Sequence, residues 1–405
     1  MESIKSIYRI GNGPSSSHTM GPRKASIMFL ERNVSASKFR VTLYGSLAAT
    51  GVGHLTDVAI ITVFKEAGKD IEIVWKPDVF LPRHPNAMLF EALTKTDETI
   101  NSWTAYSIGG GAIVDDISKL EAGRHCYPFT NMDDMLKYCN SNGITIWEVV
   151  KKYDDCDIMD YLENVWNIMQ DAIRRGLDNE GVLPGAIKLP RKAASLFVKA
   201  NGYKGTLQKR ALLFAYSLAV SEENAAGGLI VTAPTCGSCG VLPGVLYYLK
   251  TQHEFSDRKI LRALATAGLI GTIVKQNASI SGAEVGCQGE IGTACAMASG
   301  ATTQLFGGTI FQIEYSAEMG LEHHLGLTCD PVAGLVQIPC IERNAFAAAR
   351  ALNHNAYAML GDGRHRISFD KVVETMKKTG HDLPKIYRET SEGGLARYSG
   401  LADDV

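Results

Sequence analysis

The chain has 405 residues, of which 45% are hydrophobic and 21% charged, and its formal net charge is −2. This length predicts two or three domains with apolar cores. The near-neutral charge, with Lys and Arg scattered along the chain, argues against a nucleic-acid-binding protein, because binding phosphates requires a concentrated basic surface.

The chain shows no sign of a membrane segment or a signal peptide. The longest uncharged apolar run in its middle, residues 263–274, is shorter than the roughly 20 residues that cross a bilayer. Near the N-terminus the sequence reads GNGPSSSHTMGP, where a signal peptide would have an apolar stretch. We therefore expect a soluble, cytoplasmic protein without a membrane partner.

The first part of the chain, up to about residue 128, has the pattern of a mixed α/β domain. Strands are expected at residues 38–45, at 71–76 and within 98–116, and helices at 21–31 and 55–67. Residues 129–165 are rich in aspartate and are expected to form polar helix and linker.

From about residue 166 onward, long segments rich in Ala and Gly predict helices that pack closely through small residues. These segments are residues 211–228, 260–276, 289–308 and 344–360. We therefore expect an α+β fold with an α/β domain at 1–128, a polar linker at 129–165 and a mostly α-helical domain at 166–405.

The chain contains nine cysteines, and six of them lie between residues 236 and 340. An odd number in a cytoplasmic protein argues against disulfides. The clustering indicates metal or redox chemistry, although a cysteine can also serve simply as a small buried hydrophobic residue.

Two arrangements of these cysteines have weak support. Cys236 and Cys239 form a CxxC motif, which suits a redox pair or half of a zinc site, but no second pair follows at similar spacing. Cys287 and Cys295 would lie roughly 12 Å apart along one helix, too far to bind one iron. Cys295 is therefore expected to be a packing residue.

A third arrangement combines Cys287, Cys329 and Cys340, which all lie in loop-like sequence. Pro331 and Pro339 stiffen the backbone near two of them, which favours fixed ligand geometry. Three thiolates could hold three irons of a [4Fe–4S] cluster and leave the fourth iron open as a Lewis acid. Spacing alone does not choose among the three arrangements.

A loop rich in hydroxyl groups lies near the N-terminus, in GPSSSHT at residues 13–19. Such hydroxyl and backbone donors in a Gly-Pro turn bind carboxylates well. The alternative is an ordinary N-cap and turn before the helix at 21–31.

Several long motifs, in order along nearly the whole chain, resemble those of the oxygen-sensitive iron–sulfur L-serine dehydratases. They are GPSSSHT at 13–19, YGSLA at 44–48, GH at 53–54, TD at 56–57, HPN at 84–86, SIGGG at 107–111, TAPTCG at 232–237, GAEVGCQG at 282–289, LTCDP at 327–331 and PKIYRETSEGGLA at 384–396.

This resemblance implies conversion of L-serine to pyruvate and ammonia by a homodimer that uses a [4Fe–4S] cluster. It implies that the cluster is held by Cys287, Cys329 and Cys340. His54 would be the catalytic base, with His18 as the second candidate. The substrate-binding loop would consist of Ser15, Ser16, Ser17, His18 and Thr19.

The chain departs from the family pattern at two places. Cys239 stands where the family usually has a small residue, so the CxxC motif is expected to be incidental. The last six residues, GLADDV, lack the near-terminal cysteine of many single-chain relatives. We therefore expect water or a weakly held carboxylate at the open iron, because carboxylates bind iron less tightly than thiolates in a sulfur-rich site.

Serine dehydration needs a base for the Cα proton and help for hydroxide, a poor leaving group. A histidine suits the first task and an iron Lewis acid the second. Among the ten histidines, His84, His323 and His324 are rivals of His54 for such a role.

Parts of the sequence are also compatible with other functions. A pyridoxal-phosphate enzyme would need a Schiff-base lysine and a phosphate loop, and Gly109–Gly111 is a poor phosphate loop. A threonine dehydratase, a cysteine desulfidase or a non-enzymatic redox sensor could also use the same cluster.

Overall fold

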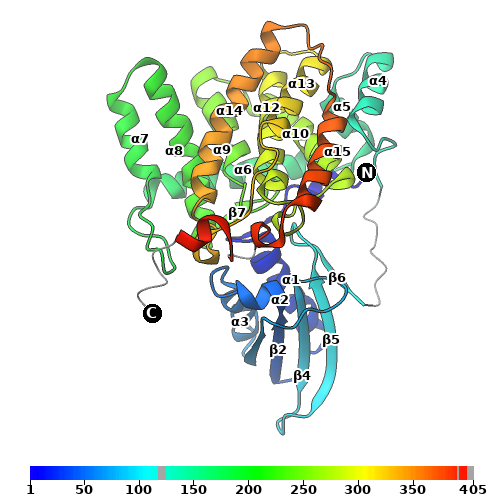
Figure 1. Cartoon of the computed structure of the whole chain (residues 1–405), viewed down its shortest axis with the longest axis vertical. Helices are drawn as coiled ribbons and strands as arrows, with labels where there is room; N and C mark the ends of the chain where they lie inside the picture. The colour runs from blue at the N-terminus through cyan, green and yellow to red at the C-terminus, as the bar shows by residue number, and fades with distance from the viewer. Residues whose placement is uncertain (117–124, 390–391, 399–405) are drawn as a thin grey trace.

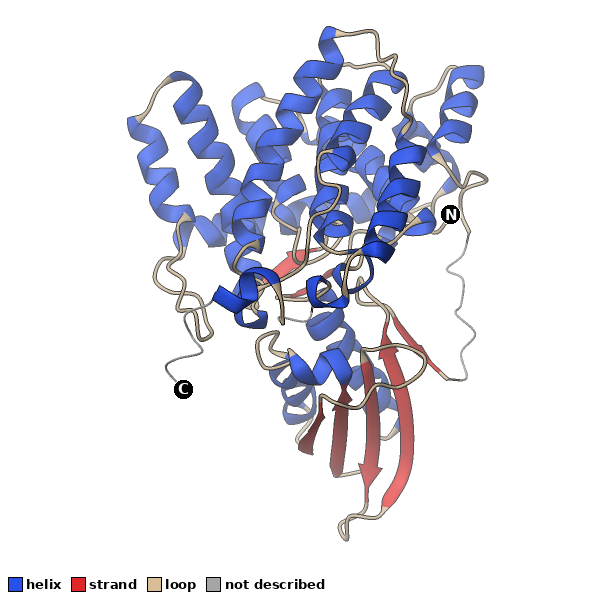
Figure 2. Cartoon of the chain, viewed as in Figure 1, coloured by secondary structure: helices blue, strands red, loops and turns tan. Residues whose placement is uncertain are grey.

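The computed structural model describes residues 1–116, 125–389 and 392–398, and it confirms the expected α+β class. A mixed sheet with helices α1–α3 forms one part, and a bundle of longer helices forms the other (Figure 1, Figure 2). No helix in these ranges is long and apolar enough to cross a membrane. The expectation about residues 400–405 concerns a segment outside the described residues.

The sheet has the strand order β3-β2-β4-β5-β6. Its strands are β2 (Lys38–Tyr44), β3 (Asp70–Lys76), β4 (Ala87–Leu93), β5 (Thr99–Ser107) and β6 (Ile113–Asp115). β2 and β3 are parallel because α2 (Gly45–Ala49) and α3 (Thr56–Glu66) cross over between them. The remaining neighbouring pairs are antiparallel.

The expected strands and helices of this part are confirmed, including α1 (Gly21–Arg32). Strand β4 was not expected. Its sequence, AMLFEAL, is apolar at nearly every position, and a short continuous apolar run does not distinguish a strand from a helix.

Aromatic side chains hold α1 against the sheet. The Phe29 ring lies 6.1 Å from that of Phe39, 5.4 Å from that of Phe90 and 6.4 Å from that of Trp103, measured between centroids. Such ring pairs stabilise a core beyond the area that they bury. They hold the C-terminal half of α1 on the sheet, and the N-terminal end of the same helix follows the loop at residues 15–19.

The helical part surrounds α12 (Thr293–Leu305), which packs against α9, α10, α13 and α14. The long helices of this part are α4 (Met132–Asn142), α5 (Ile146–Tyr153), α6 (Ile158–Asp178), α7 (Ala193–Gly202), α8 (Gly205–Ala225), α9 (Val241–His253), α10 (Asp257–Asn277), α13 (Ile310–Glu322), α14 (Cys340–Leu360) and α15 (Phe369–Asp382). The sequence of α12, TACAMASGATTQL, consists mainly of small residues, which lets its neighbours approach closely.

Gly320 of α13 provides a test of this close packing. A Cβ atom there would lie 2.7 Å from both the backbone N and the Cα of Ala296 in α12. Gly320→Ala therefore forces the helices apart, and overpacking of this kind costs about 1–3 kcal/mol. We expect a melting temperature several degrees lower. Gly202→Ala, at the end of α7 with no atom within 4 Å, is the matched control and should not melt earlier. Equal melting temperatures for both variants would contradict the packing.

Residues 129–165, expected to form polar helix and linker, do form helices, but these helices pack into the core. They form α4, α5 and the first turns of α6, and each of these helices has one apolar face in the main core. Met132, Met135, Ile146, Val149 and Leu162 are fully buried. The many aspartates suggested a linker because composition does not show on which face of a helix the polar residues lie.

The N-terminal residues also belong to the helical part. Met1, Ile4, Ile7 and Tyr8 lie in its core, and β1 (Ile10–Asn12) pairs antiparallel with β7 (Leu229–Val231). The chain therefore starts in the helical part, enters the α/β part after residue 14 and later returns. This path places the loop at residues 15–19 at the junction of the two parts.

Candidate active site

The loop at residues 15–19 forms a π-helical turn, η2 (Ser16–Met20), directly before α1. Ser15 caps this turn, since its Oγ accepts a hydrogen bond from the backbone N–H of His18 at 3.1 Å. From α8, Asn224 Nδ2 donates to the carbonyl of Pro14 at 2.9 Å and anchors the loop. The N-cap interpretation is thus correct locally, but π-helical turns also occur frequently at functional sites.

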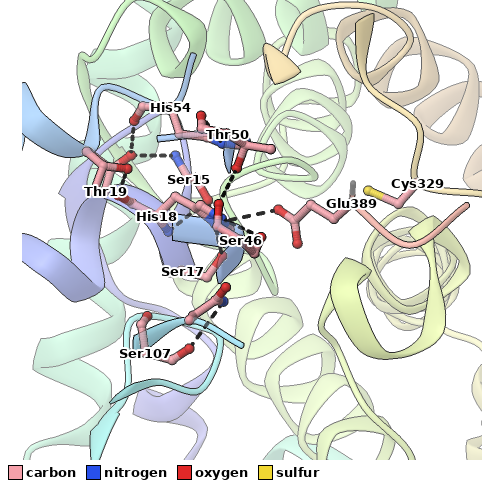
Figure 3. A network of polar contacts seen from close by, with 12 residues as sticks. Ser15, Ser17, His18, Thr19, Ser46, Thr50, His54, Ser107, Cys329 and Glu389 are labelled. Atoms are coloured by element: carbon pink, nitrogen blue, oxygen red, sulfur yellow. Dashed lines mark hydrogen bonds and ion pairs between the residues drawn. The ribbon is translucent and has the colours of Figure 1, made fainter. Parts of the chain in front are cut away.

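Hydrogen bonds join this loop to the segment that carries His54 (Figure 3). Thr19 Oγ1 donates to the carbonyl of His54 at 2.7 Å, and Thr56 Oγ1 donates to the carbonyl of His18 at 2.6 Å. His18 Nε2 lies 3.0 Å from Ser46 Oγ. The rings of His18 and His54 consequently lie side by side, with centroids 4.5 Å apart.

The protonation of His54 follows from its surroundings. Its Nδ1 lies 3.1 Å from the carbonyl oxygen of Thr50, which can only accept, so Nδ1 carries the proton and Nε2 has a free lone pair. Burial lowers the pKa of His54 to about 4, so the ring is neutral at pH 7. A neutral imidazole with a free Nε2 can accept a proton.

This pKa can be measured by NMR on protein labelled with 13C-histidine, in which the His54 signal is identified by its absence from His54→Ala. Because a lowered pKa keeps the ring neutral until the pH falls to about 4, the signal should not move between pH 8 and pH 5. A midpoint near the ordinary value of about 6.5 would contradict the buried, neutral state.

The three cysteines of the expected cluster come from separate segments of the helical part. Cys287 directly precedes a second π-helical turn, η3 (Gln288–Gly292), Cys329 lies in an extended segment bridged to Arg388, and Cys340 begins α14. Burial raises the pKa of all three thiols, and the pKa of Cys329 is raised further by negative charge on Glu290 and Glu389 and, to a smaller extent, on the other two thiols. The three thiols therefore interact electrostatically.

The surroundings of these thiols fit an iron–sulfur cluster. Ligands of a single ion would all lie within 4.8 Å of one another, and the three Sγ atoms do not. Thiolates that each bind a separate iron of a cluster lie farther apart. Arg343, which hydrogen-bonds to Cys287, supplies positive charge. At Gly282, a Cβ atom would lie 2.7 Å from Glu290 Oε2 and 3.0 Å from Cys329 Sγ, so the backbone passes this close to the sulfur only because residue 282 is a glycine.

The remaining three cysteines between residues 236 and 340 lie outside the pocket. Cys295 is fully buried inside α12, with its Sγ 3.4 Å from the carbonyl of Ala347, as expected of a packing residue. Cys236 Sγ lies 3.8 Å from Met20 Sδ, and Cys239 is fully buried. None of these three side chains is among the described residues that line the pocket.

The serine-rich loop and the cysteines face each other across one narrow pocket. It is lined by described residues that include Ser15, Ser16, Ser17, His54, Glu290, Cys329, Cys340 and Glu389. Thr19 and His18 lie behind the loop surface, where their side chains hold the two segments together. Cys287 is buried beside the pocket, next to Arg343.

Two carboxylates in this pocket were missed by the sequence analysis. Glu290 accepts a hydrogen bond from Thr235 Oγ1 at 2.8 Å, and Glu389 Oε1 lies 3.8 Å from His18 Nδ1 (Figure 3). Burial raises the pKa of both, that of Glu389 to about 8. The only available signal was their position: Glu290 follows the 282–289 motif, and Glu389 lies within the 384–396 motif.

The rival histidines have other partners. His84 Nδ1 accepts a hydrogen bond from the backbone N–H of Asn86 at 3.0 Å. His323 Nδ1 lies 3.1 Å from His354 Nε2, and His324 Nδ1 lies 2.7 Å from the carbonyl of Gly320. None of these rings is among the described residues that line the pocket.

Known proteins match the chain along almost its whole length. The family described as "Serine dehydratase alpha chain" matches residues 87–396, and "Serine dehydratase beta chain" matches residues 3–72. The chain is 41% identical to an L-serine dehydratase of Haemophilus influenzae and 43% identical to L-serine dehydratase TdcG of Escherichia coli, each over 98% of this chain and 99% of the relative.

A third relative, an L-serine dehydratase of Streptomyces coelicolor, is 41% identical over 97% of this chain and 98% of its own length. The alignment with the Haemophilus influenzae protein spans 449 residues, more than the 405 of this chain. That relative therefore carries internal residues that have no counterpart here. With matches of this length and identity, the chain belongs to the serine dehydratase family.

Proposed function

We propose that the protein is an L-serine dehydratase, which converts L-serine to pyruvate and ammonia. The observation that carries this proposal is the pocket itself, where the loop at residues 15–17 and His54 face Cys329 and Cys340. The names of the full-length relatives support the same substrate.

We further propose that Cys287, Cys329 and Cys340 hold a [4Fe–4S] cluster, in keeping with the fit described above. When bound, such a cluster supplies an open iron, a Lewis acid that can withdraw charge from the C3 hydroxyl as it leaves. No lysine is among the described residues that line the pocket, which disfavours a pyridoxal-phosphate Schiff base.

His54 is proposed to remove the Cα proton of serine. Its Nε2 has the free lone pair, and the Nδ1–H bond to the carbonyl of Thr50 steadies the positive charge that develops on the ring. The hydroxyls and backbone N–H groups of Ser15–Ser17 are suited to the substrate carboxylate. The enamine product can tautomerise and hydrolyse to pyruvate and ammonia in solution.

A comparison of three substrates tests this proposal. Turnover is measured under anaerobic conditions as pyruvate from L-serine, 2-oxobutyrate from L-threonine and sulfide from L-cysteine. We expect the highest kcat/KM for L-serine. A higher kcat/KM for L-threonine or for L-cysteine would identify that amino acid, and not L-serine, as the substrate. A protein that converts none of the three but has a redox-active chromophore would instead be a sensor.

A homodimer, implied by the family resemblance, is also proposed and can be tested by sedimentation.

A further inference from the structure

The C-terminal segment places the side chain of Glu389 across the pocket from the serine-rich loop. Its backbone N–H donates to the carbonyl of Cys329 at 2.7 Å, and the N–H of Cys329 donates to the carbonyl of Tyr387 at 2.8 Å. Glu389 has a φ of 58°, a left-handed conformation that is strained for a residue with a side chain. These two backbone hydrogen bonds, one on each side of Cys329, hold Glu389 in this conformation.

The carboxylate of Glu389 has no hydrogen-bond donor among the described residues. The nearest cationic candidate, His18 Nδ1, lies 3.8 Å from Oε1 and is already 2.9 Å from Ser17 Oγ. Burial also lowers the pKa of His18, so this ring does not supply a positive charge. The Glu389 side chain is only 13% exposed. Ionising a buried carboxyl group without a partner is costly, so a cation from outside the protein would stabilise the charged form of Glu389.

L-Serine brings such a cation. In the proposed function, the loop binds the carboxylate of L-serine and His54 removes its Cα proton, so its ammonium still needs an anionic partner. The other carboxylate among the described residues that line the pocket, Glu290, already accepts a hydrogen bond from Thr235 Oγ1 at 2.8 Å. We infer that Glu389 binds the α-ammonium of the substrate and so selects amino acids over hydroxy acids. This inference rests on the proposed function.

The direction of the side chain favours this role over binding of iron. In Figure 3 the carboxylate of Glu389 points away from the sulfur of Cys329 and towards His18 and Ser46 on the opposite side of the pocket. A ligand of the cluster would point the other way, towards the sulfur atoms. The carboxylate thus lies beside the loop that is suited to the substrate carboxylate.

The test compares two ligands that each lack one group of serine. L-Alanine keeps the ammonium but lacks the hydroxyl, and 3-hydroxypropionate keeps the hydroxyl but lacks the ammonium. Binding to the cluster-loaded protein is measured by anaerobic calorimetry. We expect Glu389→Gln to weaken L-alanine binding about 10- to 100-fold, as for loss of one charged hydrogen bond. Binding of 3-hydroxypropionate should not change, and the KM for L-serine should rise by a similar factor while kcat changes less.

Two further variants separate recognition from folding. Glu389→Asp keeps the charge and should restore part of the affinity for L-alanine. Glu392→Gln, an exposed glutamate of the same segment, should bind both ligands as the wild type does. The electron paramagnetic resonance spectrum of the reduced cluster should be the same in all four proteins.

Several results would overturn the inference. Equal weakening of both ligands by Glu389→Gln would show a general effect on the pocket, and a changed cluster spectrum would show that Glu389 contacts iron. If the wild type converts L-serine and the Glu389→Gln variant has the same KM for L-serine as the wild type, only this inference fails. If the wild type neither binds nor converts L-serine, the proposed function fails as well.

Discussion

Replacing Cys287, Cys329 or Cys340 by serine is expected to abolish both the brown iron–sulfur chromophore and the turnover of L-serine. Each thiolate would hold one iron, and a serine hydroxyl is a much poorer ligand for it. The three thiols come from separate chain segments, so no neighbouring cysteine on the same segment can substitute for a lost one. Iron content and absorbance of anaerobically purified protein provide the measurement, and turnover should fall to background.

Cys239→Ala and Cys295→Ala are the matched controls, because both side chains are fully buried and neither lines the pocket. They should keep the chromophore and the activity, even where the loss of a packed sulfur lowers stability somewhat. A full complement of iron in Cys287→Ser, Cys329→Ser or Cys340→Ser would disprove the ligand assignment for that residue.

His54→Ala is expected to keep the cluster and lose turnover by about 10²–10⁴-fold, the usual effect of removing a general base. The Nε2 lone pair that lines the pocket is lost, whereas the three cysteines on the opposite side are untouched. Exchange of solvent deuterium into Cα of L-serine should disappear together with pyruvate formation. Pyruvate formation and deuterium exchange are followed on the same anaerobic sample.

His323→Ala serves as the control, since this exposed ring lies at the end of α13 and not among the described residues that line the pocket. Its turnover should equal that of the wild type. If His54→Ala also turned over L-serine within a few-fold of the wild type, the base would be elsewhere. His18, with its ring 4.5 Å from that of His54, would then be the first residue to replace.

Local sequence patterns predicted much of the fold. Alternation at residues 38–45 gave β2, and runs of small apolar residues gave the helices that pack around α12. The patterns failed where the information is not local. The apolar run of β4 fits a strand or a helix equally well, and the burial of α4 and α5 depends on helices that lie far away in the sequence.

The site was predictable only in part, for the same reason. Hydroxyl groups and cysteines are recognisable by type, and the family motifs singled out His54 from ten histidines. Glu389 lies within a family motif and Arg343 does not, but for neither residue does the sequence show the contacts with distant segments that bring it to the site. A glutamate near the C-terminus reaches the pocket only because its segment pairs with the backbone of Cys329.

The most direct test of the central proposal, iron-dependent dehydration of L-serine, is to measure pyruvate formation against iron content. Protein is reconstituted anaerobically with graded amounts of iron and sulfide, without pyridoxal phosphate. Specific activity should rise with bound iron up to about four irons per chain, and it should disappear in air together with the broad brown absorption. Conversion of L-serine by iron-free protein, or a sharp yellow absorption band of a Schiff base, would contradict it.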